Sequence, residues 1–512
     1  MNGAEAALRT LAGGGVDVCF ANPGTSEMHA VAALDAVPAM RGVLGLFEGV
    51  VTGAADGYGR MAGRPAATLL HLGPGFGNGI ANLHNAGKAR TGIVNLVGDH
   101  AGPHKGLDAP LESDIDGIVG SVSGWVRTPR RAEDVGPAVA AAVAAASASP
   151  AEIATVILRA DAAWSEGGSE AVVHTPAPPR QVDGERIEAI AKRIARGDRV
   201  GFLLGGGALT EPGLAAAGRL VAGGAPYFME TFPARVARGA GRVAIERLGY
   251  FAEQATEQLA GVEVLVLADA ADPVSFFAYP GRPSRLAPVG CDVVALSRPG
   301  DDAEAALETL ADLVAPGTTP DVAPFDPPAR PTGALDAVTI AAAIGATLPE
   351  GAIVSDEAVT SGAFCAPLTA NAAPHDWLAL TGGAIGDGLP VAVGAAVARS
   401  DRRVLALEAD GSAMYTIQAL WTMARESLDV TVVLFSNHRY AILELEMDRV
   451  GAAGEHPKAR SLLSLDNPPI DAVALARGFG VPAERAADAA HLADLLERSY
   501  ATAGPTLIDV VL

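Results

Sequence analysis

The chain has 512 residues, too many for one hydrophobic core, and this length predicts two to four domains. A formal net charge of −22 argues against nucleic acids and anionic membrane surfaces as partners, because both would repel the protein. The sequence has neither an uninterrupted apolar run of about 18 residues nor a secretory signal pattern, so no membrane span and no export are expected. Three widely spaced cysteines (Cys19, Cys291 and Cys365) argue against a disulfide framework or a zinc site and favour a cytoplasmic location.

Two proline-rich stretches without hydrophobic periodicity interrupt the sequence and are expected to be extended linkers. They are assigned to residues 166–185 and 315–333. This division predicts an N-terminal domain over residues 1–165, a central domain over 186–314 and a C-terminal domain over 334–512, each of a size typical of one domain.

Short runs rich in valine, isoleucine and leucine alternate with alanine-rich helical stretches in all three domains. In chain order, these runs span residues 16–22, 66–72, 91–98, 199–207, 262–269, 291–297, 351–357, 403–410 and 429–437. Because the runs are apolar on both faces and are separated by helices, they indicate parallel sheets buried between helical layers. The sequence therefore predicts an α/β fold of three doubly wound parallel-sheet domains. Ligands of such sheets bind at the carboxyl ends of the strands, so the residues that follow the runs are candidates for a site.

In the N-terminal domain, Glu48 follows the apolar run VLGLF and precedes the helix-like stretch VVTGAADGYGRMAG. No other acidic residue follows it before Asp56. The surrounding residues predict that Glu48 is buried, and a buried carboxylate needs a partner because isolated burial of its charge is unfavourable. An alternative explanation is that Glu48 caps the helix that follows it.

In the C-terminal domain, Asp410 and Asn437 end two successive apolar runs. Gly411 and Ser412 follow Asp410 and open a helix that is expected over residues 413–426. A right-handed crossover would place both runs in one sheet, with the Asp410 and Asn437 side chains facing one point. Their oxygens suit Mg²⁺, and the N–H groups at the helix start suit a diphosphate. Alternatively, Asp410 is a helix N-cap and Asn437 a turn residue.

Both regions resemble signatures of the thiamine diphosphate (ThDP) enzymes. Residues 44–67 are similar to a family stretch of the form E…A…ADGYAR, and the DGS pattern with its strand-terminal asparagine is similar to the family's metal motif. The resemblance implies that Asp410, Asn437 and the backbone carbonyl of Arg439 bind Mg²⁺. It also implies that Glu48 hydrogen-bonds to the pyrimidine ring of ThDP and activates the cofactor by acid–base chemistry.

The metal motif departs from the family's common GDG…NN form at Ala409 and Ser436, neither of which supplies a side-chain metal ligand in the family. Further similar stretches extend the resemblance over nearly the whole chain, at residues 20–28, 71–86, 355–364 and 381–398.

Two of these stretches carry cofactor-binding residues by resemblance. In residues 381–398, Ile385 would lie between the two rings of the bent cofactor, and the Gly383 carbonyl would accept a hydrogen bond from its amino group. Residues 355–364 resemble a diphosphate loop with Thr360 and Ser361 as donors. The alternatives are ordinary core packing for Ile385 and a polar helix start for the loop.

Within the family, the most similar patterns are those of benzoylformate decarboxylase and the acetolactate synthase large subunit. The resemblance to the decarboxylase implies that Thr25 and His71 face the substrate, where His71 would bind a carboxylate or transfer protons near neutral pH. Asn22 and Leu443 are expected to line the same pocket. Leu443 stands where pyruvate decarboxylases have an acid, which removes that route for protons. Alternatively, His71 is a hydrogen-bonded histidine at a strand end.

Other positions differ from acetolactate synthases. Asp99 stands at the position of a glutamine of those enzymes, and the lysine that they carry beyond it is absent. In the central domain, residues 203–209 (LLGGGAL) lack the G-x-G-x-x-G spacing, so dinucleotide binding is not expected, and FAD remains an alternative that the sequence does not require. The central domain is expected to be structural, with Phe277 or Tyr279 reaching the pocket.

Together, these features predict a ThDP- and Mg²⁺-dependent enzyme that acts on a small 2-oxo acid, by decarboxylation or by carboligation of an aldehyde or ketone acceptor to a 2-hydroxyketone. In the family, the counterparts of Glu48 and of the metal site act on one cofactor from different chains. A homodimer at least, and a homotetramer as the full assembly, are therefore expected. The alternatives are a ThDP-fold binding or regulatory subunit without turnover and a nicotinamide-dependent dehydrogenase.

Overall fold

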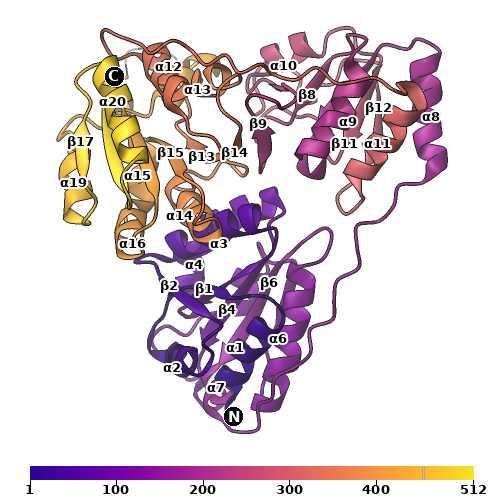
Figure 1. The fold of residues 1–512 in the computed structure, drawn as a ribbon. Coiled ribbons are helices and arrows are strands. Elements are labelled where there is room, and N and C mark those ends of the chain that lie inside the picture. The colour runs from indigo at the N-terminus through magenta and orange to yellow at the C-terminus, as the bar shows by residue number, and fades with distance from the viewer. Residues whose placement is uncertain (453, 455) are drawn as a thin grey trace.

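The computed structural model describes residues 1–452, 454 and 456–512. Their strands form three predominantly parallel sheets flanked by helices, which confirms the predicted fold class. In Figure 1 the first sheet lies in the lower lobe, the central sheet at the upper right and the third sheet at the upper left, and a long extended segment climbs from the lower lobe to the central one. The exact domain boundaries stay a prediction.

The first sheet is wholly parallel. Its strands, in sheet order, are β2 (Arg41–Leu44), β1 (Val18–Asn22), β3 (Ala66–Leu70), β4 (Ile93–Asp99), β6 (Ile153–Arg159) and β5 (Trp125–Arg127). Its helices are α1 (Gly3–Gly13), α2 (Met28–Ala33), α3 (Glu48–Ala62), α4 (Leu72–Ala89), α5 (Ile115–Val119), α6 (Ala132–Ala146) and α7 (Ala160–Trp164). The apolar core on one face includes α1 and α6, and the core on the other includes α3 and α4, which explains why the central strands are apolar on both sides.

The central sheet is parallel as well. Its strands, in sheet order, are β10 (Glu246–Arg247), β8 (Tyr227–Met229), β7 (Val200–Leu204), β11 (Val264–Ala268) and β12 (Asp292–Ser297). Its helices are α8 (Gly184–Ala195), α9 (Glu211–Val221), α10 (Ala252–Gln258) and α11 (Ala303–Val314). The order of the strands reverses between β7 and β11, so the switch point of the sheet lies between these two strands.

The third sheet has one antiparallel edge strand, β9, which comes from the central part of the chain. Its strands, in sheet order, are β17 (Ala483–Arg485), β18 (Thr506–Val511), β16 (Val430–Ser436), β15 (Val404–Ala409), β13 (Ala352–Glu357), β14 (His375–Ala379) and β9 (Val236–Arg238). Its helices are α12 (Ala337–Thr347), α13 (Cys365–Leu368), α14 (Gly388–Ala398), α15 (Asp410–Thr416), α16 (Ala419–Arg425), α17 (Ala441–Arg449), α18 (Pro457–Ser461), α19 (Ala472–Gly478) and α20 (Ala489–Tyr500).

Helices α3 and α14 join the first and third sheets through one shared apolar core. They approach so closely that a Cβ on Gly57 would collide with the Val391 carbonyl, and one on Gly394 would collide with the Ala54 carbonyl. Arg60, buried on α3, pairs with Asp56 and donates to the carbonyl oxygen of Ala379 at 2.8 Å. This joint fixes the first sheet against the segment that precedes α14.

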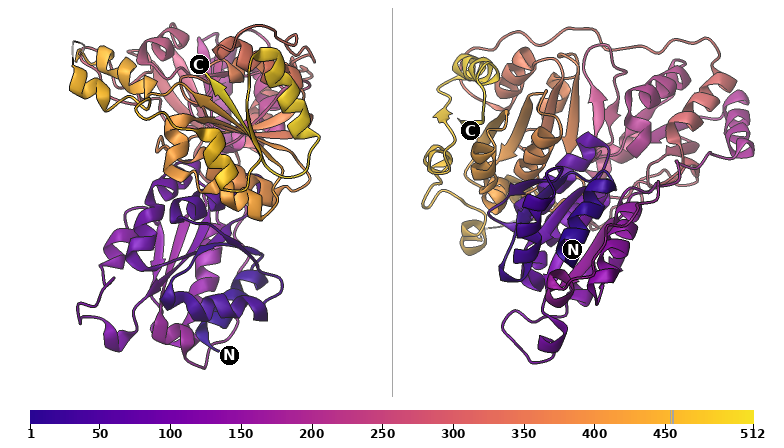
Figure 2. Two further views of the ribbon diagram at one scale, coloured as in Figure 1. Left: turned by 90° about the vertical axis from the view of Figure 1, so that its left-hand side faces the viewer. Right: turned by 60° about the horizontal axis from the view of Figure 1, so that its bottom comes forward.

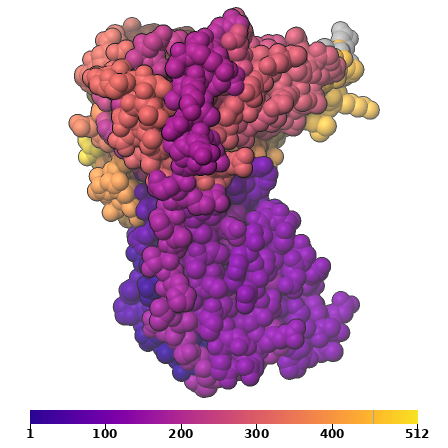
Figure 3. Space-filling model, turned by 90° about the vertical axis from the view of Figure 1, so that its right-hand side faces the viewer, coloured from indigo at the N-terminus to yellow at the C-terminus, as the bar shows by residue number. Residues whose placement is uncertain are grey.

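The lobes remain distinct in outline. Figure 2 shows the first lobe beneath the other two, with α17 and α18 projecting from the upper part. In Figure 3 the surface narrows where the lower lobe meets the upper ones. No helix in the described part of the chain has the length and apolar character needed to cross a membrane.

Candidate active site

Glu48 begins α3 at the carboxyl end of the first sheet. Phe47 occupies the N-cap position, and Glu48 makes no capping hydrogen bond, so helix capping does not account for the residue. Its carboxylate is buried and accepts a hydrogen bond from Nδ2 of Asn78 at 3.0 Å. Gly75 leaves room beside the other carboxylate oxygen, because a Cβ there would lie 2.9 Å from it. The structure thus provides a buried acid with one side-chain partner, and its role towards a cofactor stays a prediction.

His71 follows β3 and lies beside the turn that follows β1. Its Nδ1 lies 2.8 Å from Oε2 of Glu27 and 3.3 Å from Oγ of Ser26. Glu27 is 3% exposed, and its carboxylate also accepts from the Gly24 N–H at 2.8 Å. Sequence reasoning selected His71 and missed Glu27, although an acid close to Thr25 in the same post-strand turn was a usable signal. The pair fits the alternative of a hydrogen-bonded histidine at a strand end, and the role of His71 towards a substrate stays a prediction.

The remaining candidates of the first sheet lie along the same edge. Asn22 ends β1 and is half-buried, and Thr25 is exposed at the start of a 3₁₀ turn. Asp99 ends β4, is buried, and pairs with Nζ of Lys105 at 2.6 Å. This edge of the sheet therefore carries Lys105 beside Asp99, the residue that stands where acetolactate synthases have a glutamine.

The segment that was predicted to hold the bent cofactor forms a turn between β14 and α14. Gly383 has a φ of +76°, a conformation that favours glycine, and Ile385 is half-buried. Asn85 of α4 holds the turn from the first sheet by donating to the Ala384 carbonyl at 2.8 Å and accepting from its N–H at 3.2 Å. Asn82 donates to the Gly386 carbonyl at 3.0 Å. The turn, called the cradle below (residues 381–388), is thus fixed by side chains of another sheet.

Beneath the cradle, Glu357 ends β13 and accepts three backbone hydrogen bonds. The N–H groups of Gly386, Asp387 and Gly388 lie 2.7, 2.9 and 2.5 Å from its oxygens. Burial raises the pKa of Glu357 to about 7, although these N–H groups oppose the shift. Burial next to Glu357 also raises the pKa of Glu408 well above its usual range. Both buried acids escaped sequence reasoning, because each lies within a run that reads as an ordinary strand.

The predicted metal corner forms at three neighbouring strand ends. Strands β15 and β16 pair in parallel, so Asp410 and Asn437 follow adjacent strands, as predicted. Asp410 Oδ2 accepts from the N–H of His438 at 2.7 Å, and Asn437 Nδ2 donates to Oγ of Ser361 at 3.0 Å. Thr360, half-buried, precedes Ser361 in the turn that follows β13. Burial raises the pKa of Asp410, and a nearby cation would oppose this shift by favouring the charged carboxylate.

The donor set suits a cation that shares its ligands with a phosphate. Within the described residues, no three His, Cys, Asp or Glu side chains are grouped so that they could hold a metal ion. One carboxylate, the amide of Asn437 and the backbone carbonyl of Arg439 would leave positions for water and phosphate oxygens, as Mg²⁺ prefers. Gly411 fits the same corner, because a Cβ there would lie 2.6 Å from the Tyr440 ring, and Ser412 is buried beside it.

The helix expected over residues 413–426 is wrong in its bounds. Helix α15 already begins at Asp410 and ends at Thr416, and α16 begins at Ala419. The Thr416 hydroxyl donates to the Gly386 carbonyl at 3.0 Å, which ties the end of α15 to the cradle.

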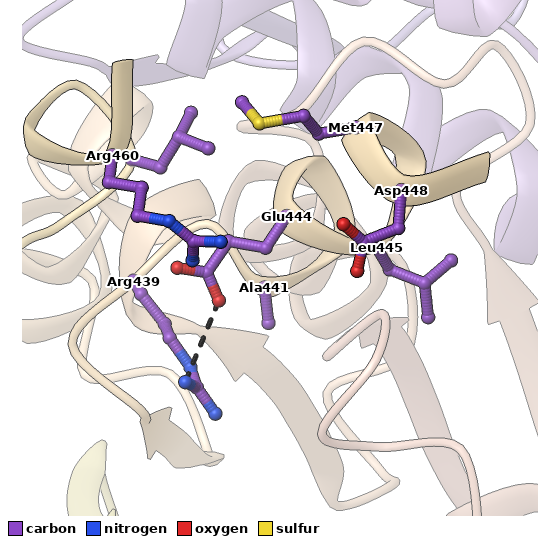
Figure 4. Close-up of a pocket in the computed structure, with 8 residues that line it drawn as sticks. Arg439, Ala441, Glu444, Leu445, Met447, Asp448 and Arg460 are labelled. Carbon is purple, nitrogen blue, oxygen red and sulfur yellow. Dashed lines mark ion pairs between the residues drawn. The ribbon is translucent and has the colours of Figure 1, made fainter. Parts of the chain in front are cut away.

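A cavity of about 250 Å³ lies beside the metal corner, between α17 and α18. The Arg439 side chain lines it and pairs with Glu444 at 3.6 Å, and Arg460 extends towards the same carboxylate in Figure 4. Arg439 thus contributes its side chain to this outer cavity, whereas its predicted contribution to a metal is its backbone carbonyl.

The central sheet reaches the cradle through one loop. Phe276 rather than Phe277 lies against Gly383, where a Cβ would be 2.5 Å from its ring. The Tyr279 hydroxyl donates to Oε1 of Glu446 on α17 at 3.0 Å. Leu443, on the same helix, is 46% exposed. The structure therefore brings an aromatic ring to the cradle that sequence reasoning placed one position further along.

The GGG turn after β7 lies at the switch point of the central sheet. Oδ2 of Asp269 accepts from the Gly207 N–H at 2.9 Å, and Arg90 from the first sheet pairs with the same carboxylate. A cavity of about 380 Å³ opens here between the two sheets. FAD binding at this turn stays an untested alternative.

No hydrogen bond among the described residues joins the Glu48 side chain to the cradle or to the metal corner. In the described part of the molecule, the Glu48 side chain has a hydrogen bond with Asn78 only. The cradle is contacted from the first sheet by Asn82, His84 and Asn85 of α4 and by Arg60 near the end of α3.

Comparisons with known proteins identify matching family models, relatives of similar sequence and solved structures of the same fold. Family models described as "Thiamine pyrophosphate enzyme, N-terminal TPP binding domain" and "C-terminal TPP binding domain" match residues 1–118 and 357–510. A Mycobacterium tuberculosis (strain H37Rv) protein, named as a candidate acetolactate synthase large subunit (IlvX), is 58% identical over 100% of this chain and 99% of its own length. Benzoylformate decarboxylase of Pseudomonas aeruginosa is 29% identical over 97% of this chain and 96% of its own. The structure of a Rhodococcus jostii RHA1 thiamine diphosphate-dependent 4-hydroxybenzoylformate decarboxylase has the same fold, with a TM-score of 0.85 at 23% identity over 99% of this chain and 98% of that one.

Proposed function

Because the chain belongs to the thiamine pyrophosphate (thiamine diphosphate) enzyme family, we propose that it is a ThDP- and Mg²⁺-dependent enzyme that acts on a small 2-oxo acid. The reaction releases CO₂, and the product is either an aldehyde or, with an aldehyde or ketone acceptor, a 2-hydroxyketone. One observation carries the proposal: a buried acid at the edge of the first sheet accompanies a corner on the third, where Asn437 donates to Ser361 and Asp410 accepts from the His438 N–H.

Each part of the cofactor has residues to hold it. Asp410, Asn437 and the Arg439 carbonyl would hold Mg²⁺. Thr360 and Ser361, with the backbone of Gly411–Ser412, would hold the diphosphate. The cradle, through Gly383 and Ile385, would hold the rings. When bound, ThDP would supply a nucleophilic carbon and an electron sink for the loss of CO₂.

The protein's own acids and bases would handle protons. Glu48, shielded from water, would hold a proton at the pyrimidine ring. The Glu27 carboxylate accepts at Nδ1 of His71, so this nitrogen carries the proton of the neutral ring, and Nε2 is left free to accept one. His71, with Thr25 and Asn22 along the same edge, would then bind the substrate and move a proton at Nε2.

The proposed assembly follows from the separation of the two halves. In the family that the chain resembles, the counterparts of Glu48 and of the metal site act on one cofactor from different chains, so the cofactor at Glu48 would be bound by the third sheet of a second copy. We propose a homodimer at least and a homotetramer as the complete form, located in the cytoplasm.

The proposal is tested by supplying the purified protein with ThDP and Mg²⁺ and a panel of 2-oxo acids, with and without aldehyde acceptors. We expect CO₂ release, and Glu48→Gln should lower turnover at least about a hundredfold, because it removes an acid–base group. The control is Glu188→Gln, which alters a surface carboxylate that is 62% exposed and pairs with Lys192. Undiminished turnover in Glu48→Gln would contradict the mechanism.

The same assay separates the alternatives. ThDP binding without CO₂ release from any 2-oxo acid would indicate a binding or regulatory subunit without turnover. With NAD(P)H added to the assay, a change in its absorbance would indicate a dehydrogenase.

A further inference from the structure

The loop between β11 and β12 is closed at its base and held in one place. Residues 273–286 form it, and their ends are joined because the Leu286 N–H donates to the Pro273 carbonyl at 2.9 Å. The Ser275 N–H donates to the Ser284 carbonyl at 2.8 Å one step further out. Leu286 is buried in the apolar core beside β11. The tip of the loop therefore has a fixed position beyond the carboxyl end of the central sheet.

At this tip, Phe276 lies directly on the cradle. Its ring occupies the side of Gly383 where a side chain would otherwise be, at 2.5 Å from a Cβ built there. Three other rings surround it: the ring centroids of Phe232, Tyr250 and Phe277 lie 5.9, 5.4 and 4.7 Å from that of Phe276. The ring is thus held in place before any ligand arrives, and 41% of the residue still faces solvent.

A second contact ties the loop to α17, which carries Leu443. Besides the Tyr279–Glu446 hydrogen bond, the guanidinium of Arg449 lies 5.0 Å from the centre of the Tyr279 ring and 4.2 Å from that of Phe251. Arg449 also pairs with Glu253 at 2.7 Å. The loop and α17 are therefore held together, with Leu443 exposed on α17.

These elements expose charged side chains (Arg282, Arg285 and Asp448) as well as large apolar or aromatic ones. Phe276 and Phe277 are 41% and 54% exposed, Leu443 is 46% exposed, and Tyr415, packed against Gly386 of the cradle, is 53% exposed. Rings held with a free face favour a flat apolar partner, because offset or edge-on packing adds to the gain from burying apolar area. A methyl group would cover little of this surface.

We propose that Phe276 determines specificity, and that the site takes a 2-oxo acid whose side chain is an aryl ring. The inference rests on the proposed function and specifies its substrate class. In this arrangement the aryl ring packs against Phe276, beside Leu443, while the oxo acid group lies over the cradle.

The test compares benzoylformate with pyruvate as substrates of the holoenzyme with ThDP and Mg²⁺. Wild type should have the higher kcat/KM for benzoylformate. Phe276→Ala should lower the benzoylformate-to-pyruvate ratio about tenfold, mainly through KM, because it removes ring contacts that a methyl group does not make. The matched control is Phe325→Ala, which truncates an exposed phenylalanine away from the cradle and should leave the ratio unchanged. An unchanged ratio in Phe276→Ala, or a wild-type preference for pyruvate, would overturn the proposal.

A binding measurement keeps this test separate from that of the proposed function. Titration calorimetry with methyl benzoylphosphonate and methyl acetylphosphonate, which cannot lose CO₂, reports the side-chain preference even if no substrate turns over. We expect Phe276→Ala to weaken binding of the benzoyl analogue about tenfold and to leave the acetyl analogue nearly unaffected. Equal affinity of wild type for the two analogues would overturn the inference whatever the turnover. Absent turnover with a clear preference for the benzoyl analogue would instead count against the proposed function alone.

Discussion

The His71 imidazole is oriented from behind by a buried carboxylate. Glu27 is one of the least exposed acids of the first sheet, and it binds both the Gly24 N–H and Nδ1 of His71. An anion in that position favours the charged imidazole that forms when Nε2 accepts a proton. Glu27 is therefore a positioning residue for the proton transfer proposed for His71.

Replacement of this carboxylate by an amide tests the pairing. In Glu27→Gln the amide oxygen can still accept from the Gly24 N–H, but the negative charge behind His71 is lost. We expect kcat to fall about ten- to a hundredfold while KM and ThDP affinity change little. Steady-state kinetics and a ThDP titration measure these quantities. A loss that appears mainly in KM, or a clear fall in the thermal midpoint, would assign Glu27 a structural role instead.

Contacts between residues that are far apart in the sequence were the hardest to predict. Glu48 and Asp410 were identified because each stands directly after an apolar run, where ligands of parallel sheets bind. The contacts of Phe276 with Gly383 and of Glu27 with His71 join separate segments, and no local pattern encodes them. Their partners depend on how the sheets pack.

Among the elements, half of the described strands were predicted from apolar runs, and the bounds of the helix after Asp410 were not. The nine apolar runs all contain strands, because buried parallel strands need apolar side chains on both faces. Strands β2, β5, β6, β8, β9, β10, β14, β17 and β18 lie outside these runs, and the antiparallel β9, for example, has only three residues, too few for a periodic signal. The helix after Asp410 divides into α15 and α16, where the Thr416 hydroxyl bonds to the cradle instead of facing solvent.

Strand β14 begins with a buried histidine that should make the third sheet sensitive to acid. His375 is 4% exposed, its Nδ1 lies 2.8 Å from the Ala373 carbonyl, and burial lowers its pKa to about 4. The unfolded chain binds a proton at this residue near pH 6.5, whereas the folded chain does so only near pH 4. Between these values protonation therefore favours the unfolded state, and the free energy of unfolding falls as the pH falls.

The effect is measurable by comparison with His375→Gln, which cannot titrate. Between pH 7 and pH 5, wild type should lose about 2 kcal/mol of stability relative to this variant. Thermal unfolding midpoints at the two pH values report the difference, and His29→Gln, which changes an exposed histidine, should keep the wild-type pH response. Parallel pH responses of wild type and His375→Gln would show that His375 is not the source.

In the molecule as a whole, the two halves of the proposed site lie on different sheets, and in the proposed assembly a second copy completes each site. Subunit complementation tests this arrangement. Glu48→Gln and Asp410→Ala should each be nearly inactive alone, but mixed subunits should recover about a quarter of wild-type activity. Random pairing makes half of the dimers hybrids, and each hybrid has one of its two sites intact.

The control mixes Asp410→Ala with Asn437→Ala, which damage the same half and should not complement. Recovery in this control, or no recovery in the first mixture under conditions where subunits exchange, would contradict shared sites.

The backbone contact between α3 and α14 also sets how a displacement travels through the protein. Gly57 and Gly394 let each helix contact backbone carbonyls of the other. Because no side chain between them can rotate to absorb a shift, we expect the two helices to move as one rigid unit. Helix α3 begins at Glu48, and helix α14 begins at the last residue of the cradle. In a dimer with shared sites, Glu48 and the cradle of one chain would contact two different cofactors. A displacement at one cofactor would therefore move residues at the other.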